Sequence, residues 1–390
     1  MEGDFIKIND WLRPLSWLYG IGVGFRNTLF NIGILKSQSF DVPVISVGNI
    51  TVGGTGKTPH VEYLLRLLHD KFRVAVLSRG YKRKTNGFVL AGDDASARTI
   101  GDEPLQMKLK FPDVAVAVDK NRRRGIGLLT DNTVVENIDV VLLDDAFQHR
   151  YVKPGINILL VDYHRLIIYD TLLPAGRLRE PQKGKNRADI VIVTKCPKDL
   201  KPMEYRVITK AMNLYPYQHL YFTTLEYEPL KHLFSSRRLA LEDIGKNTSV
   251  LLLTGIASPK QMQVDLEPYT EKIRTMAFGD HHNFSSGDVE RINSEFASLP
   301  EPRIIITTEK DATRLMPLEG LSDKVRASLY VLPIRIKFML EQEETFNENI
   351  IGYVRKNSRN SILAKAKDDD KPQNGNHLRN RTRTISFRNN

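Results

Sequence analysis

Residues 46–59 read Ser46-Val47-Gly48-Asn49-Ile50-Thr51-Val52-Gly53-Gly54-Thr55-Gly56-Lys57-Thr58-Pro59. The apolar run Val42–Val47 leads into this segment, and apolar residues at helical spacing follow it, at Val61, Leu64, Leu65 and Leu68. A strand, a glycine-rich turn ending in Gly-Lys-Thr, and a helix form the order in which a phosphate-binding loop (P-loop) occurs. A chance glycine-rich turn is the alternative, and this context disfavours it.

The residues of the loop have distinct expected roles. Glycines let backbone N–H groups turn inward around phosphate oxygens, Lys57 reaches the β and γ oxygens, and the Thr58 hydroxyl can bind Mg²⁺. Thr51 stands where the usual motif has its first glycine. The residues expected to bind ATP are Thr51, Val52, Gly53, Gly54, Thr55, Gly56, Lys57 and Thr58.

Short β-branched runs recur along the chain and predict the fold class. Continuous apolar runs separated by helix-length polar segments are typical of parallel strands covered on both faces. We expect an α/β protein: a P-loop NTPase-like, mostly parallel sheet flanked by helices, with a second, smaller α/β domain. The expected strands are Val42–Val47, Arg73–Leu77, Val114–Val118, Val140–Leu143, Ile156–Val161, Ile190–Val193, Val250–Leu253, Ile304–Ile306 and Leu329–Leu332.

Carboxylates stand where open parallel sheets bind ligands, beyond the carboxyl ends of strands. Asp144 and Asp145 end an apolar strand, as the Mg²⁺-binding acid of nucleotide enzymes does, although many strands end in Asp simply to begin a turn. Asp102 and Glu103 begin a helical pattern, where helix capping is an equally good explanation. The functional interpretation makes Asp102 a general base and Glu103 a further Mg²⁺ partner.

Basic residues and histidines supply further candidates. Arg79 follows the second strand and Arg177 the fifth; arginine suits phosphate groups, but solvated surface is the alternative. His281 lies in Phe278-Gly279-Asp280-His281-His282, a weak metal signal, and a histidine acting with a carboxylate is the better interpretation. His149, Arg177, Glu180 and Arg79 are expected to line the donor or acceptor site.

Composition and charge narrow the setting. The single cysteine, Cys196, cannot form an internal disulfide and fits a reducing compartment, so we expect a cytoplasmic protein. The net charge is +11, but residues 355–390 hold ten Lys or Arg against three Asp, so the remainder is only weakly basic. We therefore expect no nucleic acid partner, and a monomer.

The N-terminal region is apolar without being a membrane span, because Arg13, Pro14, Arg26 and Asn27 interrupt it. Leu15, Leu18, Gly22, Phe25 and Leu29 follow one helical face. An interfacial helix on a membrane surface and a helix packed on its own domain both fit this pattern.

These features divide the chain into five expected parts. They are an amphipathic membrane-proximal helix (1–36), a P-loop core domain (37–215), a linker (216–246), a second α/β domain that contributes to the cleft (247–354) and a basic, disordered tail (355–390).

Together the motifs resemble the tetraacyldisaccharide 4′-kinase family of lipid A biosynthesis. The resemblance covers about residues 10 to 350 and leaves out the basic tail. Thr51 belongs to this family's version of the loop. The matching segments are Gly48–Pro59, Ser78–Tyr81, Gly101–Pro104, Asp144–Arg150, Leu173–Pro181, Asp280–His281 and Thr308–Asp311.

The resemblance implies transfer of the γ-phosphate of ATP, with Mg²⁺, to the 4′-hydroxyl of a tetraacyldisaccharide 1-phosphate, a lipid A precursor. It also implies that Asp102 pairs with His281 as the acid–base dyad. The expected location is peripheral, on the cytoplasmic face of the bacterial inner membrane, with the N-terminal helix touching the bilayer.

Two other functions remain open from the residues. A regulatory P-loop GTPase or ATPase switch is one, since Thr194-Lys195 resembles a guanine-reading motif, although Pro197 holds the required aspartate position. A nucleic-acid-binding NTPase is the other, suggested by the basic tail.

Overall fold

The computed structural model describes residues 8–255, 259–279 and 282–369. Its larger sheet has nine strands in the order β15-β8-β7-β6-β1-β5-β2-β4-β3. In this order, all strands from β8 through β4 are parallel to one another. Strand β3 is antiparallel to β4, and β15 is antiparallel to β8. The strands are β1 (Val44–Gly48), β2 (Val74–Ser78), β3 (Val89–Leu90), β4 (Ala115–Val118), β5 (Val140–Asp144), β6 (Ile156–Asp162), β7 (Ile190–Thr194), β8 (His219–Tyr227) and β15 (Ile334–Phe338).

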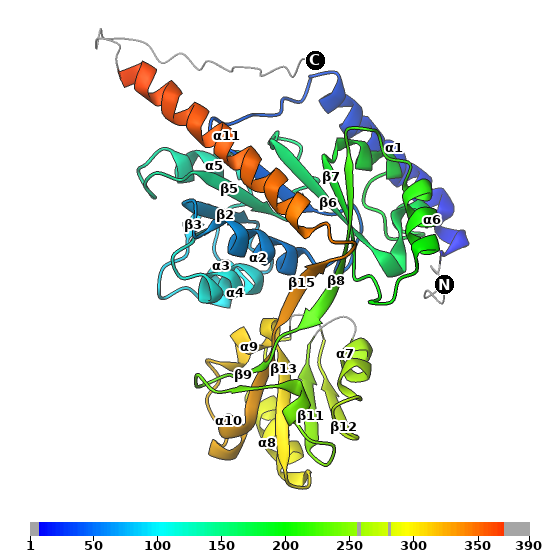
Figure 1. Cartoon of the computed structure of the whole chain (residues 1–390), viewed down its shortest axis with the longest axis vertical. Helices are drawn as coiled ribbons and strands as arrows, with labels where there is room; N and C mark the ends of the chain where they lie inside the picture. The colour runs from blue at the N-terminus through cyan, green and yellow to red at the C-terminus, as the bar shows by residue number, and fades with distance from the viewer. Residues whose placement is uncertain (1–7, 256–258, 280–281, 370–390) are drawn as a thin grey trace.

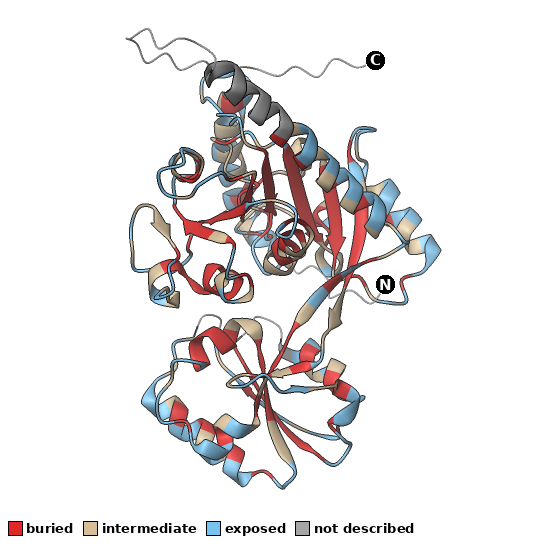
Figure 2. Ribbon diagram, turned by 60° about the vertical axis from the view of Figure 1, so that its left-hand side comes forward, coloured by how far each residue is buried: buried red, intermediate tan, exposed pale blue. Residues whose placement is uncertain are grey.

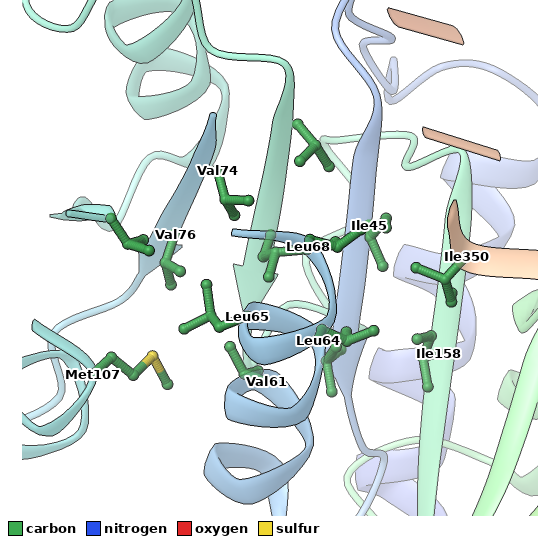
Figure 3. Close-up of a cluster of buried hydrophobic side chains, with 14 of the residues drawn as sticks. Ile45, Val61, Leu64, Leu65, Leu68, Val74, Val76, Met107, Ile158 and Ile350 are labelled. Atoms are coloured by element: carbon green, nitrogen blue, oxygen red, sulfur yellow. The ribbon is translucent and has the colours of Figure 1, made fainter. Parts of the chain in front are cut away.

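Helices flank this sheet and bury its apolar strands (Figures 1 and 2). Helix α2 packs its apolar face, with Leu64 and Leu68, against Ile45 of β1 and Ile158 of β6 (Figure 3). The helices of this domain are α1 (Arg13–Asn31), α2 (Lys57–Leu68), α3 (Ala97–Ile100), α4 (Asp102–Lys110), α5 (Arg122–Thr130), α6 (Pro202–Met212) and α11 (Glu343–Asp369).

The second domain lies below the first in Figure 1 and contains a six-stranded sheet in the order β10-β9-β14-β13-β11-β12. Its strands are β9 (Leu230–His232), β10 (Arg238–Leu239), β11 (Ser249–Thr254), β12 (Lys272–Ala277), β13 (Arg303–Thr308) and β14 (Leu329–Leu332). Its helices are α7 (Pro259–Leu266), α8 (Ser286–Ser298), α9 (Glu309–Leu315) and α10 (Asp323–Ser328). The expected α/β class with a smaller second α/β domain is confirmed.

The domain boundaries differ from the sequence-based ones. The expected linker, 216–246, holds β8 of the large sheet and β9 and β10 of the small one. The chain crosses between domains twice, along β8 and back along β15, and Glu228 N–H donates to the Pro333 carbonyl at 3.0 Å beside the crossing. Because pairing of strands about 110 residues apart has no local signal, the pattern of the sequence did not reveal it.

The expected disordered tail from 355 is also wrong for its first part, because α11 continues to Asp369. This helix returns to the first domain, where Phe346, Ile350 and Val354 are buried in the core beside α2. Spacing of four residues places the three side chains on one helical face. Residues 370–390 lie outside the described ranges.

We predict that Phe346→Ala lowers the free energy of unfolding by about 3–5 kcal/mol, because it removes a fully buried aromatic side chain that contacts Tyr63, Tyr221 and Phe338. Leu340→Ala, an exposed neighbour, is the control and should change stability little. Urea unfolding measures both. Equal stability of the two variants would show that α11 does not stabilise this domain.

Candidate active site

The phosphate-binding loop joins β1 to α2 at the carboxyl edge of the large sheet. Gly56 adopts a left-handed conformation with φ of +78° immediately before Lys57 begins the helix, and Gly53 has φ of +118°. Residues with a β-carbon rarely take these values, so glycine is required at both positions. The turn leaves the first N–H groups of α2 free of partners within the helix, which is an arrangement suited to phosphate oxygens.

Side chains from outside the loop fix its backbone. Thr194, at the end of β7, donates its hydroxyl to the Thr55 carbonyl at 3.1 Å. Lys195 donates to the Gly54 carbonyl and also pairs with Asp162 at 2.7 Å. The carbonyls of Gly54 and Thr55 are therefore fixed by hydrogen bonds from side chains that lie outside the loop.

His60 supports the same turn from within α2. Its Nδ1 lies 2.7 Å from the Gly56 carbonyl oxygen and its Nε2 lies 3.1 Å from the Thr223 hydroxyl on β8. Burial lowers the pKa of His60 to about 4, so the ring is neutral at pH 7. It acts as a neutral hydrogen-bonding bridge between the loop and the sheet.

A second segment pairs with the loop. Val52 N–H donates to the Arg177 carbonyl at 2.8 Å, and Arg179 N–H donates to the Ile50 carbonyl at 2.7 Å. Arg177 has an exposed side chain next to the loop. Glu180 is buried and forms an ion pair with Arg187 at 2.8 Å.

Three carboxylates gather beside Lys57. Asp144 ends β5, next to β1 in the sheet, and Asp145 follows it in a left-handed conformation that brings its Oδ1 to 3.5 Å from Lys57 Nζ. Glu103, from the first turn of α4, interacts electrostatically with Asp144 and Lys57. Asp144, Asp145 and Glu103, which the sequence predicts as Mg²⁺ ligands, thus come from two distant segments of the chain and lie near Lys57.

Burial and mutual repulsion oppose the ionisation of this group. Burial, followed by the charge of Asp144, raises the pKa of Glu103 to about 7. Burial, followed by the charge of Asp145, raises the pKa of Asp144. Asp144 Oδ2 accepts a hydrogen bond from Ser78 at 2.9 Å, while its buried Oδ1 has no hydrogen-bond partner among the described residues.

A divalent cation fits this chemistry, because it would supply the missing positive charge and a partner for Asp144 Oδ1. Among the described residues, however, no three His, Cys, Asp or Glu side chains converge closely enough to hold a metal by themselves. Mg²⁺ is usually bound by only one or two carboxylates together with phosphate oxygens and water, so the small number of converging ligands agrees with a Mg²⁺ site. Thr58, the second residue of α2, carries the neutral hydroxyl that the sequence predicts as a further Mg²⁺ ligand.

Asp102 is 7% exposed and forms an ion pair with Arg314 of α9, across the domain boundary. Arg314 Nε donates to Asp102 Oδ1 at 2.8 Å, and Arg314 Nη1 donates to the His282 carbonyl at 3.1 Å. His281, the expected partner of Asp102, lies outside the described residues. Arg314 was missed by sequence reasoning, and its only signal was its position six residues after Thr308, which ends β13.

His149 lies among arginines. Burial, followed by the charge of Arg122 and smaller effects of other arginines including Arg79, lowers the pKa of His149 to about 4. Arg79 is exposed at the end of β2, and Arg122 is buried and donates to the Asp144 carbonyl at 3.2 Å. The structure therefore brings Arg79 and His149 into one electropositive region beside the carboxylates.

Comparison with known proteins identifies the family. A family model described as tetraacyldisaccharide-1-P 4'-kinase matches residues 8–355. A tetraacyldisaccharide 4'-kinase of Phocaeicola vulgatus is 60% identical over 93% of this chain and 99% of its own length. The enzyme of that name from Porphyromonas gingivalis strain W83 is 45% identical over 90% of this chain and 99% of its own length.

A solved structure agrees with the sequence relatives. The crystal structure of LpxK from Aquifex aeolicus in complex with ATP has a TM-score of 0.68 and 32% identity, and covers 88% of this chain and 98% of that one. The chain therefore belongs to the tetraacyldisaccharide-1-P 4'-kinase family.

Proposed function

We propose that this protein transfers the γ-phosphate of ATP to the 4′-hydroxyl of a tetraacyldisaccharide 1-phosphate, giving a lipid A precursor. The observation that carries the proposal is the loop ending in Lys57, with desolvated carboxylates beside it, in a chain of this family. Phosphoryl transfer requires positioning and charge neutralisation more than covalent chemistry, and the site provides both.

The donor end is built from the loop. The backbone from Gly53 to Thr58 cradles the triphosphate and Lys57 neutralises charge on its β and γ oxygens. Thr58 and Asp144, with Glu103 or Asp145, would hold Mg²⁺, which would supply positive charge to balance the carboxylates and the triphosphate. Arg79, His149 and Arg177 are proposed to contact the substrates.

Asp102 is proposed to accept the proton of the acceptor hydroxyl together with His281. Its ion pair with Arg314 favours the ionised carboxylate and fixes its orientation. A carboxylate held this way is a weak base at neutral pH, so passing the proton to a histidine is reasonable chemistry. Arg314 pairs with Asp102 and also donates to the His282 carbonyl, and these two contacts support the proposal that His281 acts together with Asp102.

We predict that Lys57→Ala abolishes phosphoryl transfer while the protein stays folded, because the loop loses the charge that faces the phosphates. A loss of at least about 10²–10³-fold in kcat is expected. The measurement is transfer of labelled phosphate from ATP to a disaccharide 1-phosphate acceptor, with Lys71→Ala, an exposed lysine of the same domain, as the control. Near wild-type turnover of Lys57→Ala would refute the loop assignment.

The same assay separates the kinase from a regulatory switch. Lys195 contacts the loop, as a base-reading lysine would, but Pro197 stands where the motif has the aspartate that reads guanine. A switch protein would hydrolyse nucleotide without phosphorylating the acceptor, whereas the kinase phosphorylates the acceptor.

The acceptor carries acyl chains, and helix α1 offers a surface for a membrane. Among the described residues, none of the helices is both long and apolar enough to cross a bilayer. Helix α1 and the turn before it nevertheless leave large apolar side chains exposed, including Trp11 at 94%, Leu18 at 59% and Phe25 at 65%. We propose that this face binds the cytoplasmic surface of the inner membrane.

The opposite face of α1 is attached to the segment beside the loop. Ser16 Oγ donates to the Leu172 carbonyl at 2.9 Å and accepts from Ala175 N–H at 2.9 Å, and Tyr19 donates to the Arg179 carbonyl at 3.0 Å. Because Arg177 and Arg179 pair with the loop, a bilayer bound to α1 would lie close to the reaction site.

We predict that Leu18→Glu combined with Phe25→Glu releases the protein from vesicles that contain anionic lipid. These two apolar side chains would be buried in the bilayer, and losing them lowers partitioning on the order of 10²-fold. Vesicle sedimentation measures the effect, and turnover of long-chain acceptor should fall while ATP binding stays unchanged. The control, Met203→Glu with Leu340→Glu, changes two exposed apolar residues outside α1. Sedimentation of the folded α1 variant equal to that of the control variant would rule out α1 as the membrane surface.

A further inference from the structure

Helix α4 of the first domain contacts helix α9 of the second, and an ion pair joins the two helices at each end. Asp102, at the start of α4, pairs with Arg314 near the end of α9. Lys110, the last residue of α4, pairs with Glu309, the first residue of α9, with 2.5 Å between Nζ and Oε1. These pairs show that the two helices run antiparallel to each other. Figure 1 shows α4 and α9 on the facing sides of the two domains.

The Lys110 end of this contact reaches a third helix. Lys110 Nζ also lies 2.6 Å from Oε2 of Glu62, which is 2% exposed on α2. Gln106 of α4 donates to the other oxygen of Glu62 at 2.8 Å. One ammonium group thus joins a carboxylate of the phosphate-binding helix to a carboxylate of the second domain.

The charges in this cluster make the contact sensitive to its geometry. Two carboxylates share one lysine, and burial together with the charge of Glu62 raises the pKa of Glu309. Removing one partner of a buried ion pair leaves an uncompensated charge, which is strongly unfavourable. Without Lys110, Glu62 and Glu309 would repel each other and push α2 and α9 apart.

The three helices each carry a group of the site at or near their first turn. Helix α2 starts with Lys57, α4 starts with Asp102 and Glu103, and α9 carries Lys310, whose charge acts on Glu103. A shift of α9 would therefore move Lys310 and Arg314 relative to the carboxylates, and a misplacement of about 1 Å can cost about 10²-fold in rate.

We propose that Lys110 is a positioning residue that fixes the second domain to the phosphate-binding helix through Glu62 and Glu309, and thereby sets the rate of phosphoryl transfer. The effect on rate rests on the kinase function proposed above. Lys110 need not touch either substrate, because it acts through the helices that hold the reacting groups.

The kinetic test uses Lys110→Met in the full chain, which keeps the length of the side chain and removes its charge. We expect kcat to fall roughly 10–10²-fold with KM for ATP nearly unchanged, and Lys110→Arg to recover most of the rate. Lys108→Met is the matched control, because Lys108 lies on the same helix and, among the described residues, donates its only hydrogen bond to the Pro112 carbonyl, at 2.6 Å. Rates are compared per ATP-binding molecule, so that loss of folded protein does not count.

A double variant tests the route. If Lys110 acts through Glu309, Lys110→Met with Glu309→Gln should lose no more turnover than Lys110→Met alone. Unchanged kcat in Lys110→Met, a loss equal to that of Lys108→Met, or fully multiplicative losses in the double variant would each overturn the proposal.

A distance measurement separates this proposal from the kinase function. Spin labels at Lys71→Cys in the first domain and Glu290→Cys in the second report domain orientation, and the native Cys196 is buried. Lys110→Met should broaden or shift the distance distribution, and Lys108→Met should not. If wild-type protein phosphorylates no acceptor, the kinase function fails while this distance still decides the role of Lys110. An unchanged distribution in Lys110→Met would overturn the positioning proposal.

Discussion

The central constraint on this structure is the desolvation free energy of the carboxylates that are buried beside the phosphate-binding loop. Asp144 is buried at the end of a central strand, and burial raises its pKa and that of Glu103. In isolation such a cluster opposes folding, because desolvation favours the neutral form. It becomes favourable when cations face it, and Lys57 and Lys310 approach it from two domains. The parallel order of β1 and β5 puts Lys57 and Asp144 at the same edge of the sheet.

The second domain and helix α1 bring the rest of the reaction to that edge. Arg314 of α9 pairs with Asp102, so the candidate base is oriented by a residue from the other domain. Helix α1 is fastened to the segment that pairs with the loop, and its outer face is apolar. An acceptor with its chains in a bilayer and its sugar at the loop would satisfy both constraints. The double connection along β8 and β15 keeps the domains adjacent while leaving their orientation to side-chain contacts.

Local signals allowed much of this to be predicted from the sequence. The loop from Thr51 to Thr58, the apolar strands and the carboxylates after β5 are encoded by adjacent residues, and the family comparison confirms the fold and kinase class. Features that depend on distant partners were missed: the crossing along β8 and β15, the return of α11, and Arg314. Lys195 was noticed only as part of a motif that does not fit, yet it supports the loop backbone. The pairing of Asp102 with His281 is still a prediction, because His281 lies outside the described residues.

The central claim is that the loop and the desolvated carboxylates form one Mg²⁺-nucleotide site. A crystal structure with Mg²⁺ and a non-hydrolysable ATP analogue tests it most directly. We expect the Lys57 ammonium group at the β and γ phosphate oxygens and Mg²⁺ about 2.0–2.1 Å from the Thr58 hydroxyl. Asp144 Oδ1 should face the metal or one of its waters. A triphosphate bound away from Gly53–Thr58, or a metal with Asp144 Oδ1 still lacking a partner, would contradict the account.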